Sequence, residues 1–439
     1  MNPSKILIKE SDLKTCVDDV KKYAQDGKET GISAFGKIRS NRVYVITKIV
    51  KAGPRAERGS VSFTTDEKEI SKILEYERAV DKDTRYLIDL HSHPWPSRPH
   101  PSSIDIGQLK RVRKLRPWFT IAVFSSTGEL RFFGLDEEEN LTEIPHQVIP
   151  NGFSEEDLLS RISEITENET LRKVRVGILG CGSLGSAVVS GLAGTGINDY
   201  LLCDMDDLEI VNVIRHTGNI SQIGKPKTAI LAEYIQSHNP LSSVLTVEDD
   251  LIKNRELLHS VIESCDIIVA SSGNPELNYH INTVCFELGK KCVYGGIFAG
   301  AKSAYILSVP SKSYACFDCI FELTSAAIDQ NTLKRKYGLE NGELKQAQGM
   351  FADISIPGNI MAKMTLQILL GKESNFNLVR YFDSLKVERL NVQKRSLCAT
   401  CDYENWLKEQ EKSVMPESTT RKFVKKIGKK FRRKKNGGR

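Results

Sequence analysis

VRVGILGCGSLGSAVVSGLAG, residues 174–194, is the stretch that decides the fold. It begins with a continuous apolar run, as in strands that are buried in a parallel sheet, and passes through glycines into a helix-like segment. A second strand-like run, DYLLCD, follows at residues 199–204. Strand, helix and strand in this order predict a Rossmann-like, doubly wound α/β domain.

The residues before this stretch predict a separate, mixed α/β domain. Strand-like runs lie at 43–50, 86–90, 119–124 and 129–134, the last two as a hairpin, with one helical segment at 104–115. An acidic segment at 136–140 begins a polar connection that extends to about residue 168. We therefore predict three parts: an N-terminal domain at 1–150, the Rossmann-like domain at 151–402, and a short helix with a basic tail at 403–439.

Bulk composition indicates an ordinary globular protein. The chain has 439 residues, 40% of them hydrophobic and 27% charged, which favours two or three domains. The net charge of +6 comes from the tail, which carries eleven Lys or Arg and no acid from Arg421 onward, so it is no nucleic-acid signature. No apolar run is long enough for a membrane span and no secretory signal is visible, so we expect a cytoplasmic protein.

A histidine motif lies in the N-terminal domain. His91-Ser92-His93-Pro94 follows a strand-like run, and Asp105 comes three residues after Ser102. An H-x-H pair alone fits surface histidines equally well, but the added Pro, Ser and Asp favour a metal. Three protein ligands and an open position are typical of a catalytic rather than a structural zinc site.

These residues resemble the JAMM (MPN/JAB) zinc metallo-isopeptidases, which cleave ubiquitin-like proteins from their conjugates. The likeness includes Glu29, in ETGISAFG at 29–36. It implies that His91, His93 and Asp105 bind zinc, that Glu29 is the general base, and that Ser102 stabilises the oxyanion.

The glycine-rich turn carries a second motif. Glycines that follow a strand and open a helix let backbone N–H groups approach a phosphate, although NAD, FAD and ATP sites share this pattern. The segment at 204–216 distinguishes an ATP site from an NAD or FAD site. Its second Asp, its Asn and its Arg suit a metal ion and a triphosphate but serve no purpose in a dehydrogenase. The residues concerned are Gly180, Gly182, Gly185, Asp204, Asp206, Asn212 and Arg215.

The run from Asp204 to His216 resembles the D-x-D-x5-N-x2-R-Q pattern of the ThiF/MoeB and ubiquitin-activating superfamily. The run IGKPK at 223–227 resembles the family's G-x-P-K and places Lys227 over the phosphates. The likeness extends from about Val174 to Cys401. It implies ATP and Mg²⁺ as cofactors, Arg215 and Lys227 as catalytic groups, a homodimer through this domain, and adenylation of the C-terminal glycine of a ubiquitin-like protein.

Four of the ten cysteines form two C-x-x-C pairs, Cys316/Cys319 and Cys398/Cys401. Paired C-x-x-C spacing rarely arises from packing alone, and it suits a structural zinc that the fold brings together. The same superfamily has such a zinc, so the sequence predicts two zinc ions, one catalytic and one structural.

Two departures leave alternatives open. Gly273 stands where the family has a magnesium-binding Asp, and residues 320–397 contain no cysteine for a thioester. The favoured function is a bifunctional enzyme that processes and activates one ubiquitin-like protein, with a conjugating enzyme as a further partner. The alternatives are activation of a sulfur-carrier protein in cofactor or cysteine synthesis, and an inactive adenylation fold that serves the peptidase as a substrate platform.

The tail has Phe423, Ile427 and Phe431 at helical spacing among basic residues. Such a segment can bind an anionic membrane or an acidic partner, and a solubilising tail is the simpler alternative.

Overall fold

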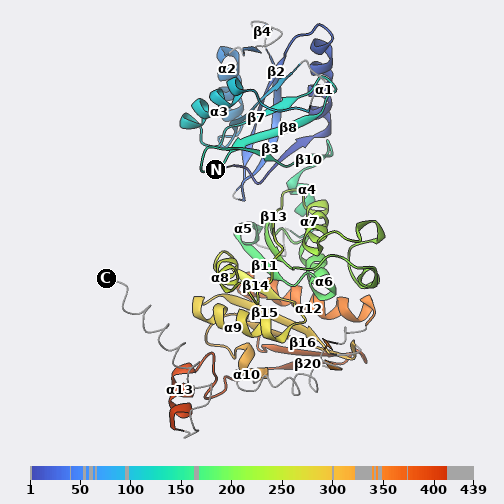
Figure 1. The fold of residues 1–439 in the computed structure, drawn as a ribbon, viewed down its shortest axis with the longest axis vertical. Helices are drawn as coiled ribbons and strands as arrows, with labels where there is room; N and C mark the ends of the chain where they lie inside the picture. The colour runs from blue at the N-terminus through green and yellow to red at the C-terminus, as the bar shows by residue number, and fades with distance from the viewer. Residues whose placement is uncertain are drawn as a thin grey trace, which may run out of the picture. The chain divides into compact units, whose positions relative to one another are not determined.

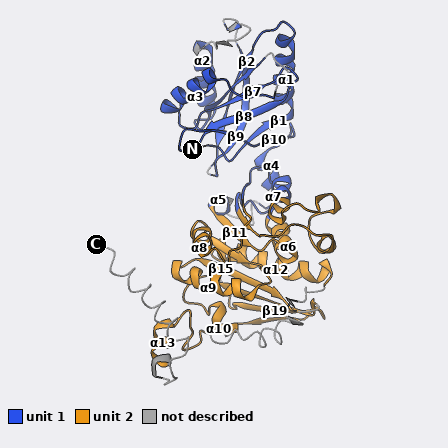
Figure 2. Ribbon diagram, in the orientation of Figure 1, with its two compact units in different colours: residues 1–173, 193–200, 233–245 blue, residues 174–192, 201–232, 246–439 orange. Residues whose placement is uncertain are grey.

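The computed structural model describes residues 2–39, 41–52, 56–58, 63–64, 67–93, 98–162, 168–298, 301–321, 339–340, 343–344, 349–372 and 374–412. Pro94 and the basic tail lie outside these ranges. Contacts divide the chain into two compact units, residues 1–173, 193–200 and 233–245, and residues 174–192, 201–232 and 246–439 (Figure 2). The predicted domain boundaries stay predictions.

The first unit is built around one eight-stranded sheet with the order β10-β1-β3-β2-β6-β7-β8-β9 (Figure 1). Its strands are β1 Lys5–Lys9, β2 Gly31–Ile38, β3 Val43–Lys51, β6 Arg85–Ser92, β7 Thr120–Phe124, β8 Leu130–Leu135, β9 Leu141–Ile144 and β10 His146–Ile149, and a separate pair is β4 Glu57–Arg58 with β5 Phe63–Thr64. Its helices are α1 Glu10–Ala24, α2 Glu67–Val80, α3 Ser103–Leu115, α4 Glu155–Leu159 and α5 Asn168–Lys173.

Helices cover both faces of this sheet. Val20 of α1 is buried with Ile32 and Leu90 on one face, while Leu109 of α3 packs with Phe35 and Phe119 on the other. The predicted strands and the hairpin of β7 and β8 are confirmed. The expectation of a single helix was wrong. In α1, Leu13, Cys16, Val17 and Val20 recur at helical spacing, a signal that the sequence argument overlooked.

The predicted polar connection at 136–168 also differs from the structure. It contains β9 and β10, and β10 pairs parallel to β1 through Ile6 and His146. Both strands are short and lie at the edges of the sheet, so they carry few buried residues that a sequence pattern could reveal.

The second sheet has the order β13-β12-β11-β14-β15-β16-β19-β20. Its strands are β11 Arg175–Leu179, β12 Asp199–Cys203, β13 Ser243–Val247, β14 Ile267–Ala270, β15 Lys291–Ile297, β16 Ser303–Val309, β19 Leu378–Phe382 and β20 Val387–Leu390. The other elements are α6 Ser183–Leu192, 3₁₀ helices η1 Ile210–Arg215 and η2 Ile220–Gln222, α7 Lys227–His238, α8 Arg255–Glu263, α9 Pro275–Leu288, α10 Phe317–Phe321, the strand pair β17 Leu339–Glu340 and β18 Glu343–Leu344, α12 Phe351–Leu369 and α13 Tyr403–Lys412.

This sheet has helices on both faces, as the sequence predicts for a Rossmann-like domain. β11, β14 and β15 are parallel neighbours. Tyr294 of β15 is buried with residues of α8 and α9, whereas a Cβ at the next residue, Gly295, would lie 2.1 Å from the Met361 sulfur of α12. Successive side chains of a strand point to opposite faces, so α9 and α12 lie on opposite sides. The predicted α/β class is confirmed. Among the described residues, no helix has the length and apolarity that crossing a membrane demands.

Candidate functional site

The glycine turn after β11 depends on two close backbone approaches. Gly180 has φ +102°, and a Cβ there would lie 2.6 Å from the backbone N of Ser272. A Cβ at Gly185 would lie 2.0 Å from the carbonyl oxygen of Gly180, whereas one at Gly182 would meet open space. Gly180 and Gly185 are therefore needed for the shape of the turn, and Gly182 leaves room beside it.

Acidic and basic groups surround this turn. One Asp204 oxygen accepts a hydrogen bond from the Cys181 amide at 2.6 Å, and the other accepts one from the Asp206 amide at 2.9 Å. The Lys227 ammonium lies 2.8 Å from Oδ2 of Asp206. Burial raises the pKa of Asp204 despite these bonds. The pocket thus holds an acid whose oxygens are oriented by the backbone and a buried lysine that is paired with a second acid.

A cavity of about 410 Å³ lies at this edge of the sheet. Of the residues proposed from the sequence, Gly180, Gly182, Asp204, Asp206 and Lys227 line it. Gly185, Asn212 and Arg215 do not, and Asn212 is buried at 9% exposure in η1. The sequence argument missed other lining residues, namely Cys203, Met205, Asp249, Asp250, Leu251, Ile252, Ser271, Ser272, Asn274 and Leu277.

Asp249 and Asp250 follow the end of β13, and the loop at 271–274 follows β14. Polar residues directly after the strands of an α/β sheet gather at its carboxyl edge. Their place after two strand-like runs was therefore a sequence signal for Asp249, Asp250 and the loop at 271–274. Gly273 lines the same cavity, and a Cβ there would meet nothing within 4 Å. An aspartate side chain at this position would therefore find space.

The histidine motif forms a cluster in the first unit. His91 is the penultimate residue of β6, and the adjoining β2 pairs with it through Gly31. Nε2 of His91 lies 3.3 Å from one oxygen of Asp105, and Nε2 of His93 lies 3.6 Å from the other. Glu29, just before β2, is buried at 8% exposure. The structure therefore brings these three residues of the motif together.

Ser102 acts locally as the N-cap of α3. Its hydroxyl donates to Asp105 Oδ2 at 2.6 Å, and its backbone N–H donates to the same oxygen at 2.6 Å. This capping box holds the carboxylate towards the histidines. In this structure the hydroxyl orients Asp105, and its predicted oxyanion role stays a prediction.

Burial and charge set the protonation of this cluster. Burial opposes the charged form of Asp105, but the adjacent rings of His91 and His93 hold the pKa of Asp105 well below its usual range. Burial lowers the pKa of His91, yet the Asp105 carboxylate more than offsets this and raises it. Burial raises the pKa of Glu29, although His91 and His93 oppose that shift. A carboxyl group with a raised pKa is suited to take up a proton.

The donor geometry of the cluster fits zinc. Bonds of ~2.0–2.1 Å in a tetrahedral site place ligand atoms about 3.3–3.4 Å apart, close to the two observed separations. Among the described residues, the buried Nε2 of His91 has no hydrogen-bond partner of good geometry, which leaves this atom available to a metal. The three donor atoms lie within 4.8 Å of one another.

The two C-x-x-C pairs form a second cluster in the other unit. Sγ of Cys316 lies 3.8 Å from that of Cys319 and 3.6 Å from that of Cys398, and the Cys319 and Cys401 sulfurs are 3.4 Å apart. Zinc–sulfur bonds of ~2.3 Å place tetrahedral ligands about 3.8 Å apart. The four thiols therefore fit a structural zinc. The other cysteines of the Rossmann-like domain, Cys181, Cys203, Cys265, Cys285 and Cys292, are all buried.

Asn282 of α9 joins the two cysteine pairs. Its oxygen accepts a hydrogen bond from the Phe317 amide at 3.0 Å, and its amide group donates to the Thr400 hydroxyl at 3.1 Å. Phe317 and Thr400 lie between the two cysteines of their respective pairs. Asn282 thus holds both knuckles to the helix that begins beside the polar cavity.

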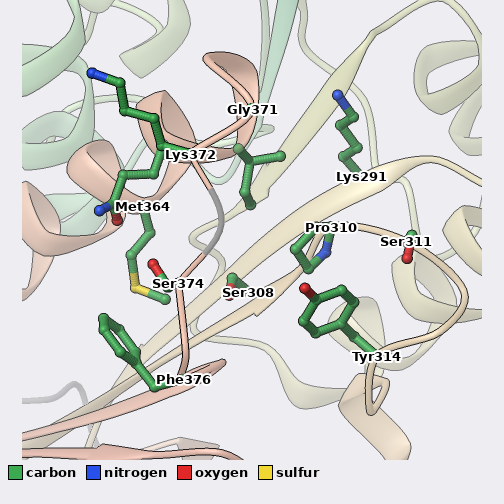
Figure 3. Close-up of a pocket in the computed structure, with 12 residues that line it drawn as sticks. Lys291, Ser308, Pro310, Ser311, Tyr314, Met364, Gly371, Lys372, Ser374 and Phe376 are labelled. Carbon is green, nitrogen blue, oxygen red and sulfur yellow. The ribbon is translucent and has the colours of Figure 1, made fainter.

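A separate cavity of about 220 Å³ lies near Tyr314, Met364 and Phe376 (Figure 3). Lys291, the first residue of β15, lines it. Because β14 runs parallel to β15, this cavity is at the opposite end of the strands from residues 271–274. It has neither the glycines nor the acids of the first cavity.

The parallel strands, the glycine turn and the polar cavity at their carboxyl edge define a Rossmann-like α/β protein. The ThiF family model matches residues 155–402, more than half of the chain. The chain belongs to the ThiF family.

Individual relatives match the chain in part. Ubiquitin-like modifier-activating enzyme 5 of Dictyostelium discoideum is 30% identical, and the match covers 51% of this chain and 61% of the relative. The enzyme of the same name from Rattus norvegicus is also 30% identical, and the match covers 60% of this chain and 65% of the relative. The chain therefore spans less than two thirds of these relatives' length. Among solved structures, E. coli MccB with ATP has a TM-score of 0.45 at 20% identity, covering 53% of this chain and 68% of MccB. PaaA has a TM-score of 0.46 at 15% identity, covering 65% and 91%.

Proposed function

We propose that the Rossmann-like domain uses ATP and Mg²⁺ to adenylate the C-terminal glycine of a ubiquitin-like or sulfur-carrier protein. The observation that carries this proposal is the cavity in which Gly180, Gly182, Asp204, Asp206 and Lys227 meet. Membership of the ThiF family and the similarity to ubiquitin-like modifier-activating enzymes support it.

Each lining group has a role that its position suits. The glycine turn offers backbone N–H groups at the start of α6, where a phosphate is favoured. Asp204 has free lone pairs for ribose hydroxyls, because each oxygen accepts only one backbone bond. ATP would supply the adenylyl group. When phosphates enter, Lys227 can turn from Asp206 to a phosphate oxygen, which leaves the Asp206 carboxylate for magnesium. Arg215, which does not line the cavity, would add positive charge from η1.

The test is ATP–pyrophosphate exchange with a panel of ubiquitin-like and sulfur-carrier proteins that end in Gly-Gly. Exchange that depends on one of them supports adenylation, and a non-reducing gel then shows whether a thiol-sensitive adduct forms. A persulfide or thiocarboxylate product would favour sulfur transfer over conjugation. No exchange with any member by wild type, but exchange by Gly273→Asp, would identify an inactive platform, since the side chain has space there.

A second function is favoured by the cluster of His91, His93 and Asp105. We propose that the first unit is a zinc isopeptidase that cleaves a ubiquitin-like precursor or conjugate. Zinc held there would supply Lewis acidity and lower the pKa of a coordinated water to about 7. Glu29 would carry the proton to the leaving amine, and Ser102 would bind the oxyanion.

We expect two zinc ions per chain. The His91→Ala/His93→Ala variant should keep one zinc, because the four cysteines are separate from the histidine cluster. Cys316→Ser should also lose one zinc and should unfold at a lower temperature, since a structural zinc contributes directly to folding stability. Metal analysis and thermal unfolding of the purified variants measure this. A histidine variant with as much zinc as wild type would contradict the catalytic site.

We also propose a homodimer through the Rossmann-like domain. The segment 210–223 exposes several large apolar side chains, including Ile210 at 72%, Ile214 at 81% and Ile220 at 76%. A patch of this kind on one segment is typical of an interface, and a second copy of the chain would cover it.

Ile214→Asp is expected to convert such a dimer to a monomer, because it places a charge in the middle of the apolar segment. Light scattering after gel filtration measures the mass. Leu115→Asp, an exposed leucine of α3, is the matched control and should keep the dimer. A wild-type chain that is monomeric at all concentrations would contradict the proposal.

A further inference from the structure

His216 connects the segment after η1 to the glycine turn. Its side chain is buried at 7% exposure. Nε2 lies 2.9 Å from the carbonyl oxygen of Cys181, and Nδ1 lies 2.9 Å from the backbone N of Gly218. His216 does not line the cavity, whereas both neighbours of Cys181 do.

The backbone partners determine the tautomer of this ring. The Gly218 N–H can only donate, so Nδ1 of His216 must accept with its lone pair. The proton is therefore on Nε2, which donates to the Cys181 carbonyl. A neutral ring satisfies both bonds, and burial lowers the pKa of His216 in the same direction.

Both polar backbone groups of Cys181 are thus held from outside the turn. Its N–H donates to Asp204 at 2.6 Å, and its carbonyl accepts from His216. The flanking glycines restrain the backbone little, since glycine occupies both signs of φ readily. Other bonds hold the flanking groups, because the Gly180 N–H donates to the Cys203 carbonyl at 2.8 Å and the Gly180 carbonyl accepts from the Ser271 hydroxyl at 2.7 Å. The Cys181 carbonyl and the Gly182 N–H belong to one planar peptide, so the His216 bond sets the direction of the Gly182 amide.

We propose that His216 is a positioning residue that holds the turn of Gly180, Cys181 and Gly182 in the conformation that binds the phosphates of ATP. The inference rests on the proposed adenylating function of the cavity. His216 directly follows η1, which carries Asn212 and Arg215. Its bond to Cys181 therefore connects the glycine turn to η1, the two parts of the predicted triphosphate site.

Three substitutions separate the two hydrogen bonds. His216→Asn can still accept from Gly218 but is too short to reach Cys181, and His216→Leu loses both bonds. His216→Gln has a donor at the reach of Nε2 and can restore the bond to Cys181. We expect ATP to bind on the order of tenfold more weakly to the Asn and Leu variants, because a buried carbonyl loses its donor. The Gln variant should bind within about threefold of wild type.

Acid should act through the same bond. Protonation of His216 places an N–H on Nδ1 against the Gly218 N–H. Because burial lowers its pKa, the neutral form persists until the pH falls below the usual histidine range, and ATP affinity should then drop. Cys181, Asp204 and Lys227 also face this region, and Asp204 titrates in every variant. The difference in the pH dependence of ATP affinity between wild type and His216→Gln therefore reports the protonation of His216 alone.

The experiment is calorimetric titration of the full-length protein with MgATP across this pH range, together with hydrogen exchange of the peptide that covers residues 180–182. His259→Leu in α8 is the control. Weaker binding and faster exchange in Asn and Leu, with rescue by Gln, support the inference. Equal affinity in wild type and Leu would overturn the positioning role alone. A wild type that binds no MgATP would overturn the proposed function and this inference with it.

Discussion

Glu29→Gln is expected to lower the rate of isopeptide cleavage by a factor of ~10²–10⁴, the usual contribution of a general base. Glutamine has nearly the same shape but cannot take up a proton. Glu29 is buried, and burial raises its pKa towards the range in which a carboxylate accepts a proton from water. The measurement is cleavage of a ubiquitin-like precursor by the full-length protein.

Zinc content separates a catalytic loss from a structural one. Glu29 is not one of the three clustered donors, so the Gln variant should keep both zinc ions. Glu143→Gln, on β9, makes the same chemical change at a half-exposed side chain that pairs with Arg131, and it should leave cleavage unchanged. Cleavage by Glu29→Gln at nearly the wild-type rate would exclude the assigned role, and loss of zinc would show that Glu29 supports the metal site instead.

Lys227→Ala should lower ATP–pyrophosphate exchange by at least ~10²–10³, the cost of removing one preorganised group that stabilises transition-state charge. The ammonium is buried at the start of α7 and faces the cavity beside Asp206. Since the buried lysine is held at one position, a mobile solvent cation does not replace it well. Exchange at saturating ATP reports this loss directly.

Lys225→Ala is the matched control, because this exposed lysine lies two residues earlier and does not line the cavity. It should retain exchange. If Lys227→Ala exchanged pyrophosphate as fast as wild type, the placement of the phosphates in this cavity would be wrong. Loss of exchange together with a lower unfolding temperature would instead indicate that the pair of Lys227 and Asp206 supports the fold.

The sequence alone determined the architecture around the glycine turn. It also identified the residues of the histidine cluster and of the two C-x-x-C pairs, and some of those that line the polar cavity. Buried parallel strands read as continuous apolar runs, and glycines between a strand and a helix mark the turn, so these features are local. The spacing of His91, His93 and Asp105 is also local, since Asp105 lies only fourteen positions after His91. The edge strand β10 was missed because it has four residues and few of them are buried, whereas α1 was overlooked although its apolar residues recur at helical spacing.

The sequence predicted that the two C-x-x-C pairs share one zinc, but only the tertiary structure decided which individual atoms meet across long separations. The Cys316 and Cys398 sulfurs come within 3.6 Å across 82 residues, and Asn282 holds both knuckles through a backbone amide and a hydroxyl. The bond from His216 to the Cys181 carbonyl likewise has no trace in the sequence. A backbone group is identical at every residue, so no pattern of side chains shows which carbonyl a buried ring will reach; the packed fold alone determines that partner.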